Sequence, residues 1–304
     1  MQQIKYDEKK QPYIDLGKGY KIRLEDEEVT DEKVLEKARI ELREESEIQK
    51  EAISELKELI NADKSFSFPH DDDFFYKIFL RPCHHYPKSA FEKLTKYFKF
   101  QIKHKKVCEN LTTESIRHVL EDDLIKYYSI RDKNGCRVLY VHGGKLWKPS
   151  KVSLNDIFRS IQLSLEAAML EPMSQINGVS VILDMEGLAL SQIVHFTPMF
   201  AAMMLEWMQE CVPVRIKGVY ITNNSYIFNI VFKIFKPFIG AKLRQRIHFL
   251  GNDWEKLADF LGKKCLMKKF NGELDAEDVD GKLLADLLGM YSHRFEELNK
   301  GGFI

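Results

Sequence analysis

The sequence predicts an α/β protein in which a helical N-terminal domain precedes an α/β/α domain with a mainly parallel sheet. Helical patterns alone fill the chain from residue 25 to about residue 110. After residue 135, short apolar strands alternate with helical stretches, as expected for right-handed βαβ crossovers. The segment 178–184 is almost continuously apolar, which is typical of a strand buried on both faces of a parallel sheet.

The composition is that of a globular protein without a charge bias. Of the 304 residues 44% are hydrophobic, and 46 basic side chains balance 46 acidic ones. This balance disfavours a nucleic-acid binder. The charged N-terminal residues lack an apolar signal region, no apolar run is long enough for a membrane span, and the five cysteines form no CxxC pair. We therefore expect a cytoplasmic protein with reduced thiols and no metal site.

The N-terminal part is predicted as an arm, residues 1–40, followed by a helical domain, residues 41–112. Residues 1–24 are polar and contain proline and glycine, which predicts an irregular segment. Acidic residues at 71–73 precede the apolar run 74–80 and predict a helix start. Apolar side chains at helical spacing predict further helices within 25–58 and over 89–106.

The α/β domain is predicted to span residues 113–274. A hairpin-like turn at 132–135 precedes strands at 137–142, 178–184, 214–221 and 246–250. Helices are predicted over 152–170, 191–210 and 226–239. Residues 275–304 start acidic and resemble part of a calcium loop, but Ala276 and Leu287 stand where the main ligands belong. We expect this last segment to be a solvated tail.

Enzyme signatures are lacking, and we expect neither catalysis nor a cofactor. Asp184 and Glu186 follow a buried strand, at the place where α/β enzymes keep catalytic carboxylates. They equally suit a structural role in capping the following turn. Cys83, His84 and His85 lack spaced partners for a metal and fit an ordinary loop.

The stretch 211–252 contains seven basic residues and no Asp or Glu. Arg215 and Lys217 alternate along a predicted strand, and Lys242 and Arg246 are four residues apart. Such a patch can bind a phosphorylated headgroup through several charge-assisted hydrogen bonds. The alternative is a scatter of solvated basic side chains, and the motif alone does not decide between the two.

The helix predicted at 226–239 is apolar on nearly all sides. Such a helix must be buried, or must meet a ligand or a membrane. It is too short and too charged to span a bilayer. Two interpretations stay open, a core helix and a mobile lid over an apolar cavity that can lie in a membrane interface.

The run from about Leu42 to Gly272 resembles the CRAL-TRIO (Sec14-like) lipid-binding family, in the branch of the alpha-tocopherol transfer protein and the cellular retinaldehyde-binding protein. The resemblance is carried by a series of ordered motifs. These are Asp72-Asp73-Phe74-Phe75, Arg131-Asp132-Lys133-Asn134-Gly135, Gln175-Ile176-Asn177-Gly178, Leu183-Asp184-Met185-Glu186-Gly187, Thr197-Pro198, Pro213-Val214-Arg215-Ile216-Lys217-Gly218, Lys236-Pro237-Phe238, Arg246-Ile247-His248 and Phe270-Asn271-Gly272.

The resemblance implies a hydrophobic pocket closed by a lid helix at about 223–239. It implies a carrier of a small hydrophobic ligand, such as a retinoid, tocopherol or carotenoid, that exchanges its ligand at phosphoinositide membranes. Alternatives in the same fold are a phosphoinositide-sensing adaptor and a Sec14-like phospholipid exchanger. We expect a cytoplasmic monomer that binds membranes transiently and binds no nucleic acid.

The resemblance also implies site residues. Two serines near the ligand hydroxyl of the tocopherol carrier align with Ile161 and Leu165, which favours a more apolar ligand. The implied headgroup site consists of Arg215, Lys217, Lys242 and Arg246. The implied pocket consists of Phe158, Ile161, Leu165, Val179, Leu183, Met204, Trp207, Met208, Val214, Ile216, Val219, Val231, Phe232, Phe235 and Ile239.

Overall fold

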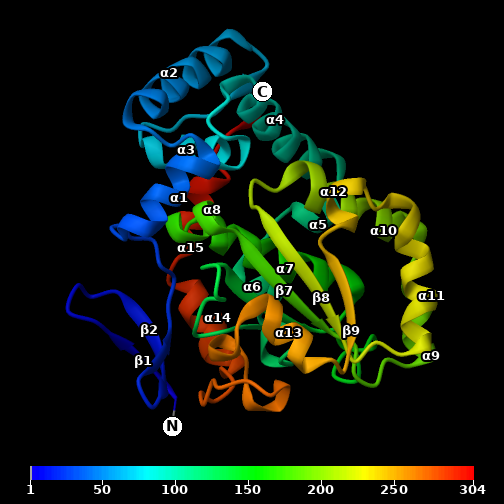
Figure 1. Ribbon diagram of the computed structural model, residues 1–304. Helices are drawn as coiled ribbons and strands as arrows, with labels where there is room; N and C mark the ends of the chain where they lie inside the picture. Colours follow the sequence, from blue (N-terminus) through cyan, green and yellow to red (C-terminus); the bar gives the residue numbers. More distant parts are fainter. Residues whose placement is uncertain (1) are drawn as a thin grey trace.

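A five-stranded sheet forms the centre of the computed structural model, which describes residues 2–304 (Figure 1). The first two strands pair antiparallel, and each later strand runs parallel to its neighbour. This mainly parallel sheet confirms the fold class predicted from the alternation of strands and helices. In sheet order the strands are β5 (Ile125–Tyr127), β6 (Arg137–His142), β7 (Val179–Asp184), β8 (Ile216–Thr222) and β9 (Ile247–Gly251).

The predicted turn at 132–135 joins the two antiparallel strands. The Asp132 carboxylate accepts hydrogen bonds from the backbone N–H groups of Asn134 and Cys136, at 2.8 and 2.9 Å. Gly135 adopts a φ of +81°, a conformation that glycine takes without steric strain. The turn therefore depends on the side chain of Asp132 and on the missing side chain of Gly135.

Helices cover both faces of the sheet, so its strands are apolar on both sides. Leu139 and Val179 pack on one face with Phe158 of α7 (Leu154–Met169). Val138 and Ile182 pack on the other face, beneath α13 (Trp254–Leu261). The remaining elements of this domain are α8 (Pro172–Asn177), α9 (Leu190–Ile193), α10 (Pro198–Glu206), a π-helical turn η2 (Trp207–Cys211), α11 (Tyr226–Phe235), α12 (Ala241–Arg244) and the 3₁₀ turns η3 (Lys236–Phe238), η4 (Lys263–Cys265) and η5 (Lys268–Phe270).

The N-terminal helical domain packs above this sheet in the view of Figure 1. As predicted, an acidic residue starts its third helix: the Asp72 carboxylate accepts from the N–H of Phe74. The helix predicted over 89–106 ends at Lys103, and a short helix follows it. The helices are α1 (Glu32–Leu42), α2 (Ser46–Ala62), α3 (Asp73–Leu80), η1 (Arg81–Cys83), α4 (Pro87–Lys103) and α5 (Lys105–Cys108). The next helix, α6 (Thr113–Glu121), packs instead on α7 of the α/β domain.

The expectation of an irregular segment over residues 1–24 is wrong, because this segment forms a three-stranded antiparallel sheet. Ile14 and Leu16 alternate with polar residues and are buried together with Ile22. The proline and glycines that suggested irregularity stand at strand ends and at the turn. The strands are β1 (Gln3–Tyr6), β2 (Pro12–Gly17) and β3 (Tyr20–Ile22).

The expectation of a solvated tail after residue 275 is also wrong. Its acidic start caps a helix, since the Asp280 carboxylate accepts from the N–H groups of Lys282 and Leu283. Leu284 and Leu298 are fully buried. The segment forms α14 (Gly281–Gly289), α15 (Ser292–Leu298) and β10 (Gly302–Phe303), and β10 pairs antiparallel with β4 (Phe66–Ser67) of the helical domain.

The single helix predicted over 191–210 is interrupted. α9 ends at Ile193, and α10 starts at Pro198 with the hydroxyl of Thr197 accepting from the N–H of Phe200. Proline lacks the N–H that a continuous helix requires, but it suits the first turn of a new helix. The break places α9 and α10 beside α11 (Figure 1).

Candidate functional site

An apolar cavity of about 150 Å³ lies between the sheet and α11, at the carboxyl ends of the parallel strands. Leu183 of β7 and Ile221 of β8 form part of its floor. Phe232 and Phe235 of α11 form part of its roof. The carboxyl edge of an open parallel sheet is where ligands bind in α/β folds, so the position of the cavity is typical of a binding site.

The wall of the cavity carries almost no polar side chain. His142 stands at its edge, but its ring packs 4.4 Å from that of Tyr140, on the opposite face of the sheet. Burial lowers the pKa of His142 to about 4, so its imidazole is neutral at pH 7. Trp147 also lines the cavity, and its indole N–H donates to the carbonyl of Val152 at 2.9 Å. The cavity therefore suits a hydrophobic molecule.

Most of the pocket residues implied by the resemblance lie on this wall. They come from α7, from β7 and β8, from the helix α10 with its π-helical turn, and from α11 with the turn after it. Those on the wall are Phe158, Ile161, Leu183, Met204, Met208, Val219, Val231, Phe232, Phe235 and Ile239.

Five of the implied residues lie in the core instead: Leu165, Val179, Trp207, Val214 and Ile216. Val179 and Ile216 begin their strands, whereas the cavity lies at the opposite, carboxyl end. Leu165 is about one helical turn beyond Ile161, away from the cavity. Their side chains lie on the same faces of these helices and strands as residues that line the cavity. They lie at other positions along the helix or strand and so do not reach the cavity.

Several wall residues were not anticipated from the sequence. Val141, Met185 and Ile221 lie at the carboxyl ends of adjacent parallel strands. Ligands bind at this edge of a parallel sheet, and applying that rule would have identified these residues. Gly143 approaches this end closely, since a Cβ there would lie 2.8 Å from the sulfur of Met185. Phe196 and Phe200 lie on either side of the start of α10 and line the cavity. The sequence predicted an unbroken helix there, so the direction of these two side chains toward the cavity was not predicted.

Three of the four predicted headgroup residues lie together beside the N-terminal end of β8. Arg215 and Lys217 both contact the carboxylate of Glu41, at 3.1 and 3.5 Å. Arg246 donates to the carbonyl of Ile216, and its pKa is lowered first by burial and then by the charge of Arg215. We call Arg215, Lys217 and Arg246 the basic cluster.

Lys242 stands apart from the direct contacts of the basic cluster. It belongs to the short helix α12, and its charge acts on the thiol of Cys83. Cys83 ends η1, which packs against α1, the helix that carries Glu41.

The carboxylate of Asp184 has a structural role. It accepts hydrogen bonds from the Tyr140 hydroxyl, the Glu186 N–H and the Asn223 side chain, and so ties the ends of neighbouring strands together. His84 and His85 bind the carbonyls of Glu41 and Leu42 at the end of α1. Among residues 2–304, no group of three or more His, Cys, Asp or Glu side chains could hold a metal ion.

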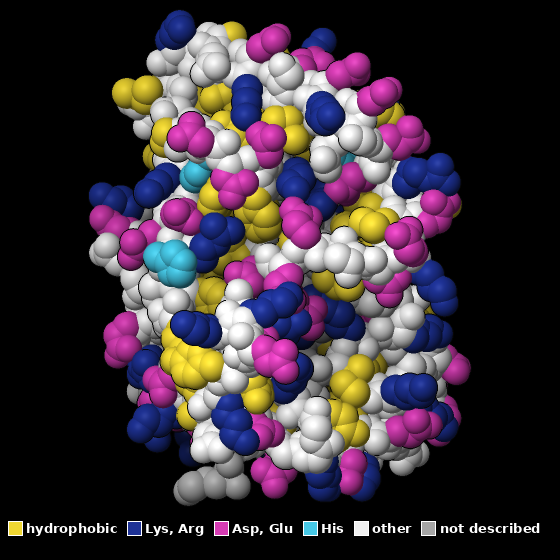
Figure 2. All heavy atoms as spheres, turned by 90° about the vertical axis from the view of Figure 1, so that its left-hand side faces the viewer, with side chains coloured by type: hydrophobic (Ala, Val, Ile, Leu, Met, Phe, Trp, Pro, Cys, Tyr) yellow, Lys and Arg dark blue, Asp and Glu magenta, His cyan; other side chains and the backbone are white. Residues whose placement is uncertain are grey.

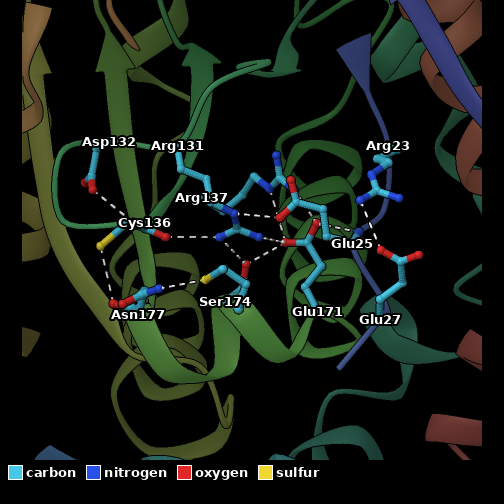
Figure 3. Close-up of polar contacts among 12 residues, drawn as sticks. Arg23, Glu25, Glu27, Arg131, Asp132, Cys136, Arg137, Glu171, Ser174 and Asn177 are labelled. Atoms are coloured by element: carbon cyan, nitrogen blue, oxygen red, sulfur yellow. Dashed lines mark hydrogen bonds and ion pairs between the residues drawn. The ribbon is translucent and has the colours of Figure 1, made fainter. Parts of the chain in front are cut away.

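A buried ion cluster joins the N-terminal segment to the α/β domain (Figure 3). Arg131 and Arg137 converge on the carboxylate of Glu171, and both also contact Glu25. Ser174 donates to Glu171 at 2.5 Å. Burial raises the pKa of Glu171, but the charges of Arg137 and Arg131 outweigh it and lower the value to about 2. Arg131 belongs to the motif 131–135, and Ser174 directly precedes the motif that starts at Gln175. The cluster therefore holds these two motifs side by side.

An exposed apolar surface surrounds α11. Val194, Met199 and Tyr226 are 75%, 82% and 72% exposed, and Leu190 and Ile230 lie on the same group of helices. We call these five residues the lid face. The side of the molecule away from α11 differs, because Figure 2 shows charges of both signs interspersed over it. No helix within residues 2–304 has the length and apolarity needed to cross a bilayer.

A mainly parallel sheet with an apolar cavity beneath a separate helix is the architecture of the Sec14-like class of lipid-binding proteins. The family model for the CRAL/TRIO domain matches residues 121–272. The chain belongs to the CRAL-TRIO family of lipid-binding and lipid-transfer proteins.

Named relatives agree with this assignment. The chain is 30% identical to clavesin-1 of Mus musculus over 257 residues, 84% of this chain and 72% of the relative. It is equally similar to the alpha-tocopherol transfer protein-like protein of Mus musculus, of which the match covers 75%. The crystal structure of Sfh5 shares the fold, with a TM-score of 0.50 and 13% identity over 89% of this chain and 99% of that one.

Proposed function

We propose that the protein carries a small hydrophobic ligand in the cavity beneath α11 and exchanges it at phosphoinositide-containing membranes. The observation that carries this proposal is the apolar cavity roofed by a helix that also exposes apolar side chains, Tyr226 and Ile230, on its outer side. Similarity to an alpha-tocopherol transfer protein-like protein supports a ligand of the retinoid, tocopherol or carotenoid type. The proposed setting is the cytoplasm, with transient binding to membranes.

The size of the cavity implies that α11 moves during loading. At about 150 Å³ the cavity is smaller than the usual ligand pocket of roughly 300–1,000 Å³. Flexible methionines such as Met204 and Met208 line it and can repack around a guest. Burial of about 300 Å² of apolar ligand surface would contribute about 7 kcal/mol before ordering costs. Such a ligand leaves slowly unless α11 opens.

Features of the surface support exchange at a membrane. The lid face places exposed apolar side chains around α11, where lipid contacts can replace the contacts between helix and cavity. Lys233 and Lys236 stand on the same segment and favour anionic lipid. The basic cluster supplies donors for a phosphorylated headgroup, whose binding would favour the open state by differential affinity.

The wall of the cavity favours a ligand without a buried polar group. Ile161 lines the cavity at one of the two positions where the tocopherol carrier has a serine. Leu165, at the other position, is buried in the core. Ser160 and Ser164 lie on the same helix but are fully buried elsewhere. A hydroxyl deep in this cavity would therefore lack a side-chain partner from these positions.

Native mass spectrometry of the purified protein, followed by organic extraction, tests the proposal. A retinoid, tocol, carotenoid or other neutral lipid released from the protein supports the carrier function. A bound phospholipid would indicate Sec14-like phospholipid exchange instead. A protein that carries nothing and takes up none of these lipids would indicate a phosphoinositide-sensing adaptor.

Matched variants locate the ligand. Phe232→Asp places a charge on the roof of the cavity, and we expect it to lower ligand occupancy at least tenfold because a buried charge without a partner is strongly disfavoured. Lys233→Gln changes the neighbouring position, which is not part of the wall, and should leave occupancy unchanged. Equal occupancy in the two variants would place the ligand elsewhere.

A further inference from the structure

Glu41 of the helical domain contacts the basic cluster, which is the predicted headgroup site. We propose that Glu41 is an internal competing anion, which makes this site select headgroups by their number of phosphates. The inference rests on the proposed function, since it concerns the same site. It concerns a specificity-determining residue on α1, outside the basic residues themselves.

Glu41 accepts from two of the donors that a headgroup oxygen would use at this predicted site. Its Oε2 lies 3.1 Å from Nη1 of Arg215 and 3.5 Å from Nζ of Lys217. The side chain of Arg215 is only 13% exposed, and its Nε and Nη2 groups are buried without a hydrogen-bond partner. A carboxylate thus satisfies one of the three nitrogens of Arg215, and the other two still lack an acceptor.

The charges at the cluster are not balanced. Burial and the charge of Arg215 lower the pKa of both Lys217 and Arg246, so the three cations repel one another. Burial raises the pKa of Glu41, but Lys217 and Arg215 outweigh it and hold the carboxyl ionised. Lys37, on the same helix, adds a further positive charge near Glu41. One carboxylate therefore faces several cations, which leaves the site attractive to a stronger anion.

Hydrogen bonds hold the backbone of Glu41 in place, whereas its side chain can move away from the basic cluster. The rings of His84 and His85 bind the carbonyls of Glu41 and Leu42, at 2.7 and 3.0 Å. Lys37 ties the same helix to Asn177 of α8 with a contact of 2.7 Å. The Glu41 side chain is 38% exposed, so its carboxylate can rotate into water without moving α1.

Competition by the Glu41 carboxylate sets a minimum negative charge that a headgroup needs in order to bind this site. A headgroup with one phosphodiester brings a single negative charge and would replace one anion by another of equal charge. Each added phosphate monoester brings about −1.5 to −2 charges at pH 7 and three more acceptor oxygens. A multiply phosphorylated headgroup therefore displaces Glu41 with a net gain, whereas a singly charged one does not.

Vesicle flotation with Glu41→Gln tests the inference. Phosphatidylcholine vesicles carry equal mole fractions of phosphatidylinositol, its monophosphate or its bisphosphate. We expect Glu41→Gln to raise affinity for monophosphate vesicles by about two- to fivefold, the range that one partly exposed ion pair supports. Affinity for bisphosphate vesicles should rise by a similar factor, because the bisphosphate displaces the same carboxylate, and binding to phosphatidylinositol vesicles should become measurable. Glu36→Gln is the matched control, because Glu36 is on the same helix and its carboxylate pairs with Arg39 instead of the basic cluster.

Two further measurements make the result specific. In the background of Lys217→Gln, the change from Glu41→Gln should shrink, because the two residues interact directly. Titration with soluble inositol trisphosphate and inositol monophosphate distinguishes a lipid headgroup from a free inositol phosphate. The same rise in affinity in both formats supports the lipid assignment, whereas a rise with the soluble compounds alone overturns that assignment.

The outcomes separate this inference from the proposed function. If the unmodified protein and Glu41→Gln both fail to bind every phosphoinositide vesicle, the headgroup site itself is wrong and the inference falls with it. If the unmodified protein binds and Glu41→Gln keeps the same affinity for each kind of vesicle, only the role of Glu41 is overturned. Thermal unfolding of each variant verifies that a change in binding does not come from a loss of fold.

Discussion

Two buried glutamates five residues apart have opposite electrostatic surroundings. Glu171 faces Arg137 and Arg131, which lower its pKa to about 2. Glu166 accepts from the Tyr97 hydroxyl at 2.9 Å and from the Asn299 amide at 3.1 Å. Burial outweighs these two hydrogen bonds and raises the pKa of Glu166 to about 7. The same side-chain chemistry thus stabilises the fold at one position and costs stability near neutral pH at the other.

Glu166→Gln is expected to stabilise the protein above pH 7 and not near pH 4. Because the folded state holds the proton more tightly than the unfolded chain, stability falls as pH rises from about 4.5 to about 7. A neutral glutamine removes this loss, which amounts to as much as about 3 kcal/mol. Urea unfolding at pH 4 and pH 8 measures it. Equal effects of the variant at both pH values would contradict the prediction.

Glu171→Gln is expected to destabilise the protein at pH 7 by about 3–5 kcal/mol, since it leaves two arginines without their buried counter-charge. The contribution of Glu171 is present above the unfolded pKa of about 4.5 and is lost as pH falls toward 2. The difference between the variant and the unmodified protein should therefore shrink in acid, as urea titrations would show.

The control for this variant is Glu186→Gln. Glu186 forms an exposed ion pair with Lys145, at 2.7 Å. Exposed pairs contribute little, so we expect a change below about 1 kcal/mol. A loss for Glu171→Gln no larger than that of this control would show that the buried cluster does not stabilise the fold.

At the level of elements, α9, α10 and α11 form one surface whose exposed apolar side chains are predicted to meet lipid. The double variant Val194→Ser with Tyr226→Ser removes two of the most exposed members of the lid face. We expect vesicle binding and ligand transfer to fall several-fold, because less apolar surface enters the interface. Ligand uptake from solution should persist, since neither residue lines the cavity.

Ile40→Ser is the matched control for the lid-face variant. Ile40 is 71% exposed, as apolar as Val194, and belongs to α1 of the helical domain. Vesicle flotation and a fluorescence transfer assay compare the two. A similar loss in both variants would indicate a general effect of surface hydrophobicity rather than a docking surface around α11.

The central elements could be predicted because local and tertiary preferences agree in them. The buried run 178–184 and the hairpin turn at Asp132 lie where the sequence predicted them. The first 24 residues could not be predicted in this way, because β1 to β3 are short and polar on one side. Their strands gain stability from pairing and from packing on α14, which no local pattern contains.

The sequence predicted which side of each helix or strand faces the candidate site. It did not predict which positions along that side reach the cavity. Periodicity indicates which side of an element is apolar, and it selected Leu183 and Val179 together. Only the fold shows that Leu183 reaches the cavity while Val179, at the start of the same strand, stays in the core. The contact of Glu41 with Arg215 joins residues 174 positions apart, and no sequence spacing predicts it.

At the level of the whole molecule, ligand binding is expected to raise thermal stability. A ligand that binds only the folded state stabilises it by about 2.7 kcal/mol at one hundred times its Kd. For a chain of this size that corresponds to a Tm higher by roughly 5 °C. Calorimetry of delipidated and reloaded protein measures this change. Phe232→Asp should show no rise, and a missing rise in the unmodified protein would contradict binding in a folded cavity.

The pairing of β10 with β4 has a consequence for synthesis. The helices that precede the sheet are synthesised before it, yet Phe66 of β4 packs 5.1 Å from Phe303 of β10, which is synthesised after it. The helical domain therefore completes its packing only after the sheet and the lid helix have been made. Until then Phe66 and its aromatic neighbours stay partly uncovered, so the helical domain of a nascent chain exposes aromatic surface that chaperones can recognise.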